Sequence, residues 1–428
     1  MRPTSSAPRR LGAQPRGLSG RASVLLAGNV GYALAQFGVL VVLARGTSPA
    51  QVGQYALALA ITAPVQIGLG LRLRTVLAVD SSRTPFRTYF RLALSLAVAA
   101  VVVATAVGLV AAPGLALVVA LVAASKGVES LIDVCYGEDQ RHDRLHAVAA
   151  SQLVRAAMTV AAAALGVHLA GLLGALVAIL LVWLGQLLVL DQRRARTDPV
   201  AGGHRSPPVT PGWLVRHSWP LGIGGAVVSL SVALPRFVIA DLLDAASLGL
   251  FAVLSYPTTA VSLFANSLGQ AQVRAMAAAA EGRDFRRLSS LVLRAAAATV
   301  AVGVLGAVAV LLLGSAGIAW LLGPSYARDV PLLVLLVLVA TLSGVATVSY
   351  YLLVSSGRFG LQPVVVLATL VVAAPAIHLA TARWGLTGTA VALAAMYLLQ
   401  TLLTIAAALS NLARARPRTA ADTTRETR

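Results

Sequence analysis

The chain has 428 residues, of which 58% are hydrophobic and only 11% are charged. Soluble globular proteins are typically about half apolar and about one quarter charged, and the mean hydropathy of this chain is +0.83. The composition excludes a soluble enzyme, a disordered tail protein and a secreted disulfide scaffold. It predicts an all-α polytopic membrane protein.

The net charge of +19 arises from 34 basic and 15 acidic residues. The basic residues form short clusters between long apolar runs, which is the pattern of cytoplasmic membrane loops that meet anionic lipid headgroups. We therefore expect the lipid bilayer as a partner, and no nucleic acid. Cys135 is the only cysteine, so no internal disulfide can form.

The N-terminus is polar and basic as far as Arg21, and an apolar run of about 20 residues follows. A signal-peptide core is shorter, about 7–15 residues, so this run is expected to be the first membrane helix. Since one spanning helix needs about 20 residues, the sequence predicts about 12 transmembrane helices. They are residues 23–44, 52–71, 88–111, 114–135, 147–168, 170–190, 217–240, 246–268, 289–313, 330–354, 360–382 and 386–409.

The distribution of basic residues tests this count. With the N-terminus in the cytoplasm, 28 of the 34 basic residues fall in cytoplasmic segments and three in outer loops, as the positive-inside rule requires. A multi-pass protein of the cell membrane with both termini in the cytoplasm is therefore expected. Its predicted parts are a basic arm (1–22), a six-helix bundle (23–190), a Pro/Gly-rich cytoplasmic linker (191–216), a second six-helix bundle (217–409) and a cytoplasmic tail (410–428).

The two predicted bundles resemble each other. Residues 43–56 match residues 239–252 in character, which aligns Gly53 with Gly249. Because six is an even number, both bundles enter the membrane in the same direction and form parallel repeats, with a substrate cavity expected between them. Two further matches keep the order, with 167–170 recurring at 377–380 and 171–174 recurring at 385–388.

Several short motifs occur in a fixed order from about residue 25 to residue 410. They are the Gly-Tyr-containing stretch 43–71, its second-half counterpart 239–252, Leu-Gly-Pro-Ser-Tyr-Ala at 322–327, Leu-Leu-Val-Ser-Ser-Gly-Arg at 352–358 and Gly-Leu-Thr-Gly-Thr-Ala at 385–390. This series resembles the Wzx-like polysaccharide flippases of the multidrug/oligosaccharidyl-lipid/polysaccharide exporter superfamily. The sequence departs from that family in helix 7, where Pro235 stands at the position of a frequent Asp before Arg236.

The resemblance implies a MATE/MOP-like fold that moves polyprenyl-pyrophosphate-linked oligosaccharide from the cytoplasmic to the outer face of the membrane by alternating access. A polysaccharide polymerase or a glycosyltransferase is a further expected partner. No enzyme activity and no cofactor are expected. The sequence has neither a phosphate-binding Gly-x-x-x-x-Gly-Lys-Ser/Thr loop nor a Cys/His metal-binding cluster.

Charged residues inside a membrane segment are candidates for function, because burying a charge in lipid is costly. Lys126, Glu129 and Asp133 are spaced three and four residues apart, which places them on one helix face. They could line the cavity, with a carboxylate serving as a proton or cation site. The alternative is a self-neutralising cluster that seats the helix against its neighbour.

The arginines present the same choice. Arg155 could hold a phosphate by bidentate hydrogen bonds, or it could extend to the headgroups or pair with the fourth segment. Arg236 lies at the outer part of the seventh segment, where contact with the outer headgroups is equally open. Arg72 and Arg74 end the second segment, where membrane anchoring competes with a place in the cavity.

Pro64 and Pro257 lie inside the repeat-related second and eighth segments. Proline removes a helical hydrogen bond and kinks the helix, and membrane helices tolerate such kinks. The two kinks are interpreted either as hinges for a rocking motion or as static bends.

Two other functions stay open from the sequence. A multidrug or cation antiporter of the same fold would need a neutral or acidic cavity with a deep carboxylate. A membrane glycosyltransferase or polymerase would depend on outer acidic residues such as Asp241 and Asp329.

Overall fold

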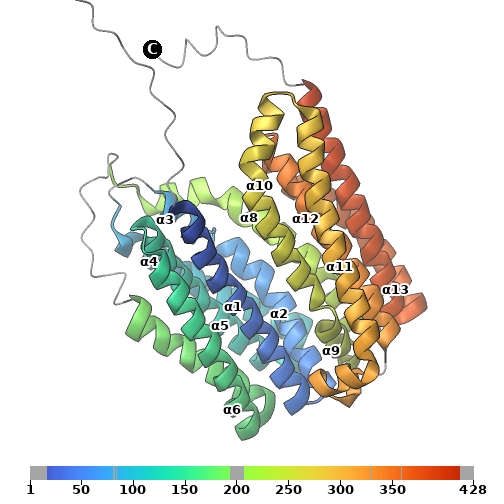
Figure 1. Ribbon diagram of the computed structural model, residues 1–428. Coiled ribbons are helices and arrows are strands. Elements are labelled where there is room, and N and C mark those ends of the chain that lie inside the picture. Colours follow the sequence, from blue (N-terminus) through green and yellow to red (C-terminus); the bar gives the residue numbers. More distant parts are fainter. Residues whose placement is uncertain are drawn as a thin grey trace, which may run out of the picture.

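The computed structural model describes residues 17–192 and 207–414, apart from residues 81, 83, 328 and 358. The predicted arm, linker and tail therefore lie largely outside the described residues. Almost all of the described chain is helical (Figure 1). The main helices are α1 (Gly17–Gly46), α2 (Pro49–Leu69), α3 (Leu73–Val79), α4 (Phe86–Ala111), α5 (Ala116–Arg141), α6 (Leu145–Gln186), α8 (Pro211–Leu242), α9 (Ala245–Leu254), α10 (Pro257–Glu281), α11 (Phe285–Leu322), α12 (Val330–Ser355) and α13 (Gln362–Arg414).

Two of these elements, α6 and α13, are each a pair of antiparallel helices. In α6 the amide of Gln186 donates to the Ser151 hydroxyl at 2.8 Å, whereas 35 residues of straight helix would separate them by about 52 Å. The chain reverses at Gly171, whose φ of 58° suits glycine. In α13 the reversal lies at Gly385, also with φ 58°, and the hydroxyls of Thr381 and Thr389 meet at 2.8 Å.

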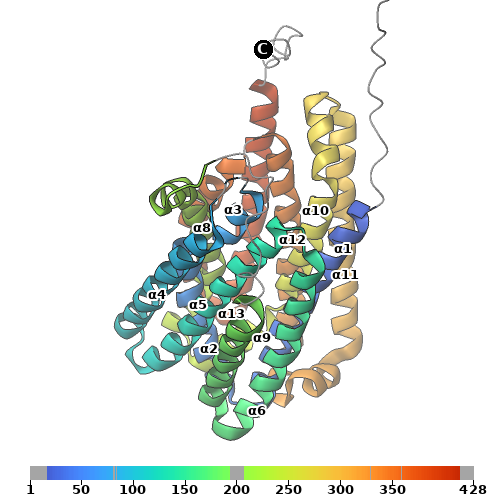
Figure 2. The same ribbon diagram turned by 90° about the vertical axis from the view of Figure 1, so that its left-hand side faces the viewer.

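All twelve predicted apolar segments are helical, and this confirms the predicted fold class. Nine elements of the described chain are long and apolar enough to cross a membrane, α1 adds a shorter apolar helix over Val30–Gly46, and the reversals in α6 and α13 add one crossing each. Both described ends of the chain lie at the same end of the molecule (Figures 1 and 2). An even number of crossings produces this arrangement.

Two helical segments differ from the prediction. The 72–91 region, expected to be a loop, contains the short helix α3, whose backbone at Arg74 packs against Gly137 of α5. The linker was expected to extend to residue 216, but α8 already begins at Pro211. The Thr210 side chain caps this helix start by accepting from the Trp213 amide at 3.2 Å, and proline suits the first helical position.

The repeat-related second and eighth segments are both interrupted, but at different places. Pro64 lies inside α2, which continues to Leu69 and ends where Leu71 and Arg72 adopt left-handed backbone conformations (φ 50° and 49°). Such values are uncommon for residues other than glycine. Pro257 does not kink a continuous helix, because it occupies the first turn of α10 after the break that follows α9.

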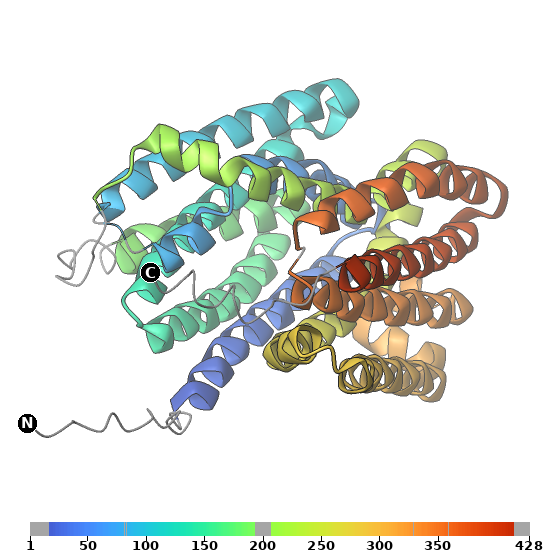
Figure 3. The same cartoon turned by 90° about the horizontal axis from the view of Figure 1, so that it is seen from above.

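Seen from above, α1–α6 and α9–α13 lie side by side, and α8 runs from beside the helices of the first half across to α13 (Figure 3). The two halves of the chain meet where α2 contacts α8 and α9. A Cβ atom on Gly53 would lie 1.8 Å from the carbonyl oxygen of Ala245, and a Cβ atom on Gly249 would lie 1.9 Å from the carbonyl oxygen of Pro49. The two contacts mirror each other, so the glycines aligned from the sequence occupy reciprocal positions where α2 and α9 meet.

Candidate functional site

A cavity of about 420 Å³ lies between α1, α2, α3, α4 and α5 of the first half. Five charged side chains line it, three basic and two acidic, together with polar side chains from α1, α2 and α5. The polar and charged lining residues are Tyr32, Gln66, Arg72, Arg74, Lys126, Glu129, Ser130 and Asp133. Lys126, Glu129 and Asp133, predicted to share one helix face, all lie in this lining.

Glu129 joins three helices. Its carboxylate accepts a hydrogen bond from the Tyr32 hydroxyl of α1 and forms an ion pair with the Lys126 ammonium at 2.8 Å. The Arg155 guanidinium of α6 lies 3.9 Å away from the same carboxylate. The Gln36 amide extends the chain of contacts by donating to the Tyr32 hydroxyl at 2.6 Å. The carboxylate thus compensates two basic groups that would otherwise face each other in the apolar interior.

Arg155 lies behind the cavity wall. Its side chain is 2% exposed, and its guanidinium carbon lies 4.6 Å from the Tyr32 ring centre, with the Tyr136 and Trp183 rings at 5.5 and 5.6 Å. Cation–π attraction and the Glu129 charge therefore hold it in place. Of the three possibilities from the sequence, a phosphate contact, a headgroup contact and pairing with the fourth segment, the structure shows the Glu129 contact that belongs to the third.

Arg74 and Arg72 both line the cavity but have different surroundings. The Arg74 guanidinium pairs with the Asp133 carboxylate at 3.1 Å and so ties α3 to α5. Arg72 is exposed and lies against α8, where a Cβ atom on Gly225 would come within 3.2 Å of its Nε atom. Among the described residues Arg72 makes no ion pair, so its charge is available to a ligand in the cavity.

Arg236 lies outside this cavity wall. It is partly buried in α8 and stands close enough to Tyr55 of α2 and Tyr397 of α13 for its charge to act on both phenols. No carboxylate of the described chain forms an ion pair with it. Arg236 thus contributes an uncompensated positive charge where helices of the two halves approach each other.

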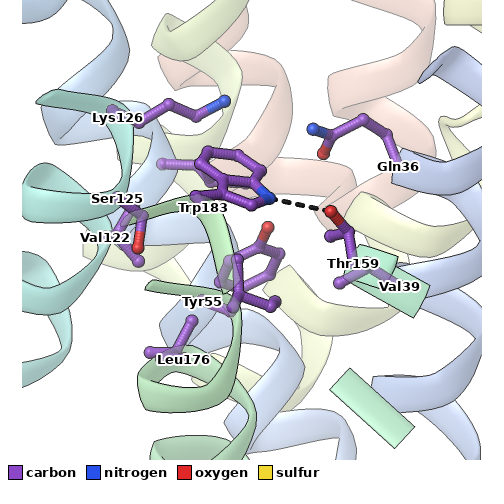
Figure 4. A pocket seen from close by; sticks show the side chains of 11 residues that line it. Gln36, Val39, Tyr55, Val122, Ser125, Lys126, Thr159, Leu176 and Trp183 are labelled. Atoms are coloured by element: carbon purple, nitrogen blue, oxygen red, sulfur yellow. Dashed lines mark hydrogen bonds between the residues drawn. The ribbon is translucent and has the colours of Figure 1, made fainter. Parts of the chain in front are cut away.

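A second, much smaller cavity of about 20 Å³ lies on the other side of Lys126, deeper in the first half (Figure 4). Its volume holds about one water molecule. The Trp183 indole donates to the Thr159 hydroxyl across it at 2.7 Å, and the Lys126 ammonium lies 5.8 Å from the indole ring centre. Lys126 therefore lines both cavities.

A polar network fixes the loop that follows α3. The Asp80 carboxylate accepts hydrogen bonds from the Ser82 backbone and side chain and from the Tyr89 hydroxyl, and Arg141 lies 3.9 Å away. Burial acts to raise the pKa of Asp80, but these hydrogen bonds and the Arg141 charge outweigh it and hold the pKa below its usual value. This loop positions α3, and hence Arg72 and Arg74.

Sequence reasoning missed several members of the site. Tyr32, Gln66 and Ser130 line the larger cavity, and Trp183 lines the smaller one. Gln36 and Gln66 carried a usable signal, because a polar amide inside an apolar membrane segment needs a partner. No sequence signal showed that the aromatic rings of Tyr32, Tyr136 and Trp183 surround Arg155.

Solved structures share this fold. An inward-facing multidrug resistance MATE transporter of the MOP superfamily aligns with a TM-score of 0.66 at 13% identity, covering 95% of this chain and 96% of that one. An outward-facing MATE transporter aligns with a TM-score of 0.65 at 13% identity, covering 94% of this chain and 99% of that one. A MOP superfamily transporter from Pyrococcus furiosus, described as having a binding pocket of reverse polarity, aligns at 0.60 and 13% identity, covering 92% and 93%. The chain therefore has the transporter fold of the MOP superfamily.

Sequence comparison identifies the family. The capsular polysaccharide biosynthesis protein CapF of Staphylococcus aureus is 22% identical over 310 residues, which cover 72% of this chain and 78% of CapF. The model of the family described as polysaccharide biosynthesis protein matches residues 20–273, more than half of the chain. This membrane protein with a transporter fold therefore belongs to the polysaccharide biosynthesis protein family.

Proposed function

We propose that the chain is a flippase that moves a polyprenyl-pyrophosphate-linked oligosaccharide from the cytoplasmic to the outer face of the cell membrane. One observation carries this proposal, namely the excess of positive charge in the cavity that α1 to α5 enclose. Arg72, Arg74 and Lys126 face two carboxylates there, and Arg72 has no acidic partner among the described residues. Guanidinium and ammonium groups of this kind bind phosphate oxygens.

The physical task explains the cavity. The lipid tail can remain in the bilayer, but the pyrophosphate must cross an apolar layer in which an unpaired charge is costly. A cation-lined cavity provides it with a counter-charge along the path. A carrier of organic cations would need the opposite polarity, so the lining argues against the antiporter alternative.

Alternating access is the proposed mechanism. The proposed rocking units are the bundles 23–190 and 217–409, with hinges at Pro64, inside α2, and at Pro257, in the first turn of α10. In the arrangement seen here, the glycine contact between Gly53 and Gly249 holds α2 and α9 together at one end of the molecule. That end is proposed to be the outer one, because the positive-inside distribution places the basic loops and both termini in the cytoplasm.

The test is a reconstituted flipping assay. The purified chain is placed in liposomes that contain undecaprenyl-pyrophosphoryl N-acetylglucosamine, and a membrane-impermeant galactosyltransferase reports how fast sugar from the inner leaflet appears outside. Wild type should accelerate this appearance, R72A and K126Q should lose most of the acceleration, and R383A should retain it. Arg383 is a suitable control because its charge lies over the Trp384 ring, outside both cavities.

Two results would overturn the proposal. If the sugar of the inner-leaflet lipid appears outside no faster with the wild-type chain than in protein-free liposomes, the chain is not a flippase for this class of lipid. Uptake of a cationic dye that depends on Glu129, in vesicles that do not flip the lipid, would instead establish the antiporter.

A further inference from the structure

The two halves place equivalent glycines in α5 and α12. A Cβ atom on Gly127 would lie 3.2 Å from Val101 of α4 and would also contact α2. A Cβ atom on Gly344 would lie 2.5 Å from Thr299 of α11 and 2.8 Å from Val261 of α10. Since α10 and α11 occupy in the second half the places of α2 and α4 in the first, Gly127 and Gly344 are equivalent positions in the two repeats.

This equivalence relates the charged wall, by which we mean Arg72, Arg74, Lys126, Glu129 and Asp133 of the cavity lining, to a counterpart in the second half. With Gly127 aligned to Gly344, three polar residues of the cavity lining in α5 have hydroxyl-bearing counterparts in α12, whereas Glu129 aligns with Ala346. The equivalent pairs are Lys126 and Ser343, Ser130 and Thr347, and Asp133 and Tyr350. The second half thus has hydroxyl groups in place of Lys126 and Asp133 and a methyl group in place of Glu129, so this face of α12 carries no charge.

The neutral stripe continues onto the neighbouring helices. The Ser343 hydroxyl lies 3.4 Å from the Ser262 hydroxyl of α10 and stands close to the phenol of Tyr397 of α13. The Tyr351 hydroxyl donates to the Asn266 amide oxygen at 3.1 Å. We call the resulting surface the neutral wall; it comprises Ser262, Asn266, Ser343, Thr347, Tyr350 and Tyr397.

The neutral wall adjoins the charged cavity. Arg72, which lines the cavity, stands close enough to Tyr350 for its charge to act on that phenol. Arg236 stands in the same relation to Tyr397 and to Tyr55 of the first half. The Tyr350 hydroxyl is partly buried and forms no hydrogen bond with any residue of the described chain. It is therefore free to bond to a ligand that enters between the halves.

We propose that the neutral wall binds the sugar of the substrate while the charged wall of the first half binds its pyrophosphate. The assignment rests on the proposed function and deepens it. Sugar hydroxyls both donate and accept, as do the hydroxyl and amide groups of the neutral wall.

The experiment compares two probe lipids on the full chain in nanodiscs, undecaprenyl pyrophosphate and undecaprenyl-pyrophosphoryl N-acetylglucosamine. Wild type should bind the sugar-bearing lipid more tightly. Y350F removes one hydroxyl that has no partner in the described chain, and it should weaken binding of the sugar-bearing lipid by about 3- to 10-fold, the effect of one hydrogen bond. It should leave the affinity for undecaprenyl pyrophosphate unchanged, whereas K126Q should weaken the binding of both lipids.

Y326F is the matched control, because the Tyr326 hydroxyl is also buried and unpartnered among the described residues but lies in the segment between α11 and α12. It should change neither affinity. Equal affinity of wild type for the two lipids, or equal weakening of both by Y350F, would overturn the neutral wall while leaving the flippase proposal intact. Failure of wild type to bind either lipid would overturn the flippase proposal itself.

Discussion

The glycine contact between the halves gives the sharpest structural prediction. In G53A the added methyl carbon would lie 1.8 Å from the Ala245 carbonyl oxygen and 2.8 Å from its carbonyl carbon. Real Cβ atoms essentially never come closer than 3.0 Å to such atoms, and both partners are helix backbone that cannot rotate away. The helices α2 and α9 must therefore separate by roughly 1–1.5 Å at this point.

The free-energy cost follows from overpacking, which typically amounts to about 1–3 kcal/mol. Since each 1.4 kcal/mol is a factor of ten, the closed arrangement should lose population relative to the open one by roughly 5- to 150-fold. G249A should have a similar effect, because its methyl group would meet the Pro49 carbonyl oxygen at 1.9 Å. The free-energy cost of the double variant G53A/G249A should be smaller than the sum of the two single costs, since one separation of α2 and α9 relieves both clashes.

Thiol labelling measures this opening. A cysteine at Ala56, which is 3% exposed and one turn from Gly53, should react with a polar maleimide at least 5-fold faster in the G53A background. Cys135 is buried, and its replacement by serine removes the background. G185A is the control, because a Cβ atom there meets nothing within 4 Å and alanine favours a helix. An unchanged labelling rate at Ala56 in G53A, with the protein folded, would refute the reasoning.

Two further predictions concern the charges. E129Q should lower the free energy of unfolding by about 3–5 kcal/mol, because the Lys126 and Arg155 charges would remain buried without a compensating carboxylate. The thermal unfolding temperature in detergent measures this loss. An unchanged temperature would contradict the proposed role of the Glu129 carboxylate. D80N should lower the unfolding temperature at pH 7, where hydrogen bonds to the carboxylate stabilise the fold by about 1–3 kcal/mol. The folded-state pKa of Asp80 lies below its usual value, so this stabilisation is present above about pH 4 and is lost as the pH falls through the folded-state pKa. The difference from wild type should therefore shrink in acid, and a difference that stays constant from pH 7 to pH 3 would contradict the assignment.

The sequence was sufficient to predict the candidate charges but not their pairing. Helical spacing alone predicts Lys126, Glu129 and Asp133 on one face, and all three side chains line the cavity of about 420 Å³. It could not show that Arg155 lies behind that face, because a helix position 29 residues from Lys126 fixes neither depth nor neighbours. The rings of Tyr136 and Trp183 that surround Arg155 come from different helices and carried no signal of their own.

The helix interruptions were likewise predictable from the sequence only in part. The prolines at 64 and 257 do not locate the breaks, because Pro64 lies inside α2 and Pro257 begins α10. The left-handed residues Leu71 and Arg72 end the second segment, although neither residue favours that conformation by itself. Tertiary contacts impose it, since Leu71 is buried between the halves beside Gly222 and α3 packs on Gly137.

The sequence by itself determined the membrane class, the twelve segments and the parallel repeat, because hydropathy, basic-residue bias and an even number of crossings are properties of the chain in one dimension. Only the tertiary structure decided which charges compensate one another and which remain available, because pairing depends on distances between side chains from different helices. It also decided that the repeats are unequal in chemistry. Lys126 and Ser343 became comparable positions only once Gly127 and Gly344 were seen to make the same helix contacts.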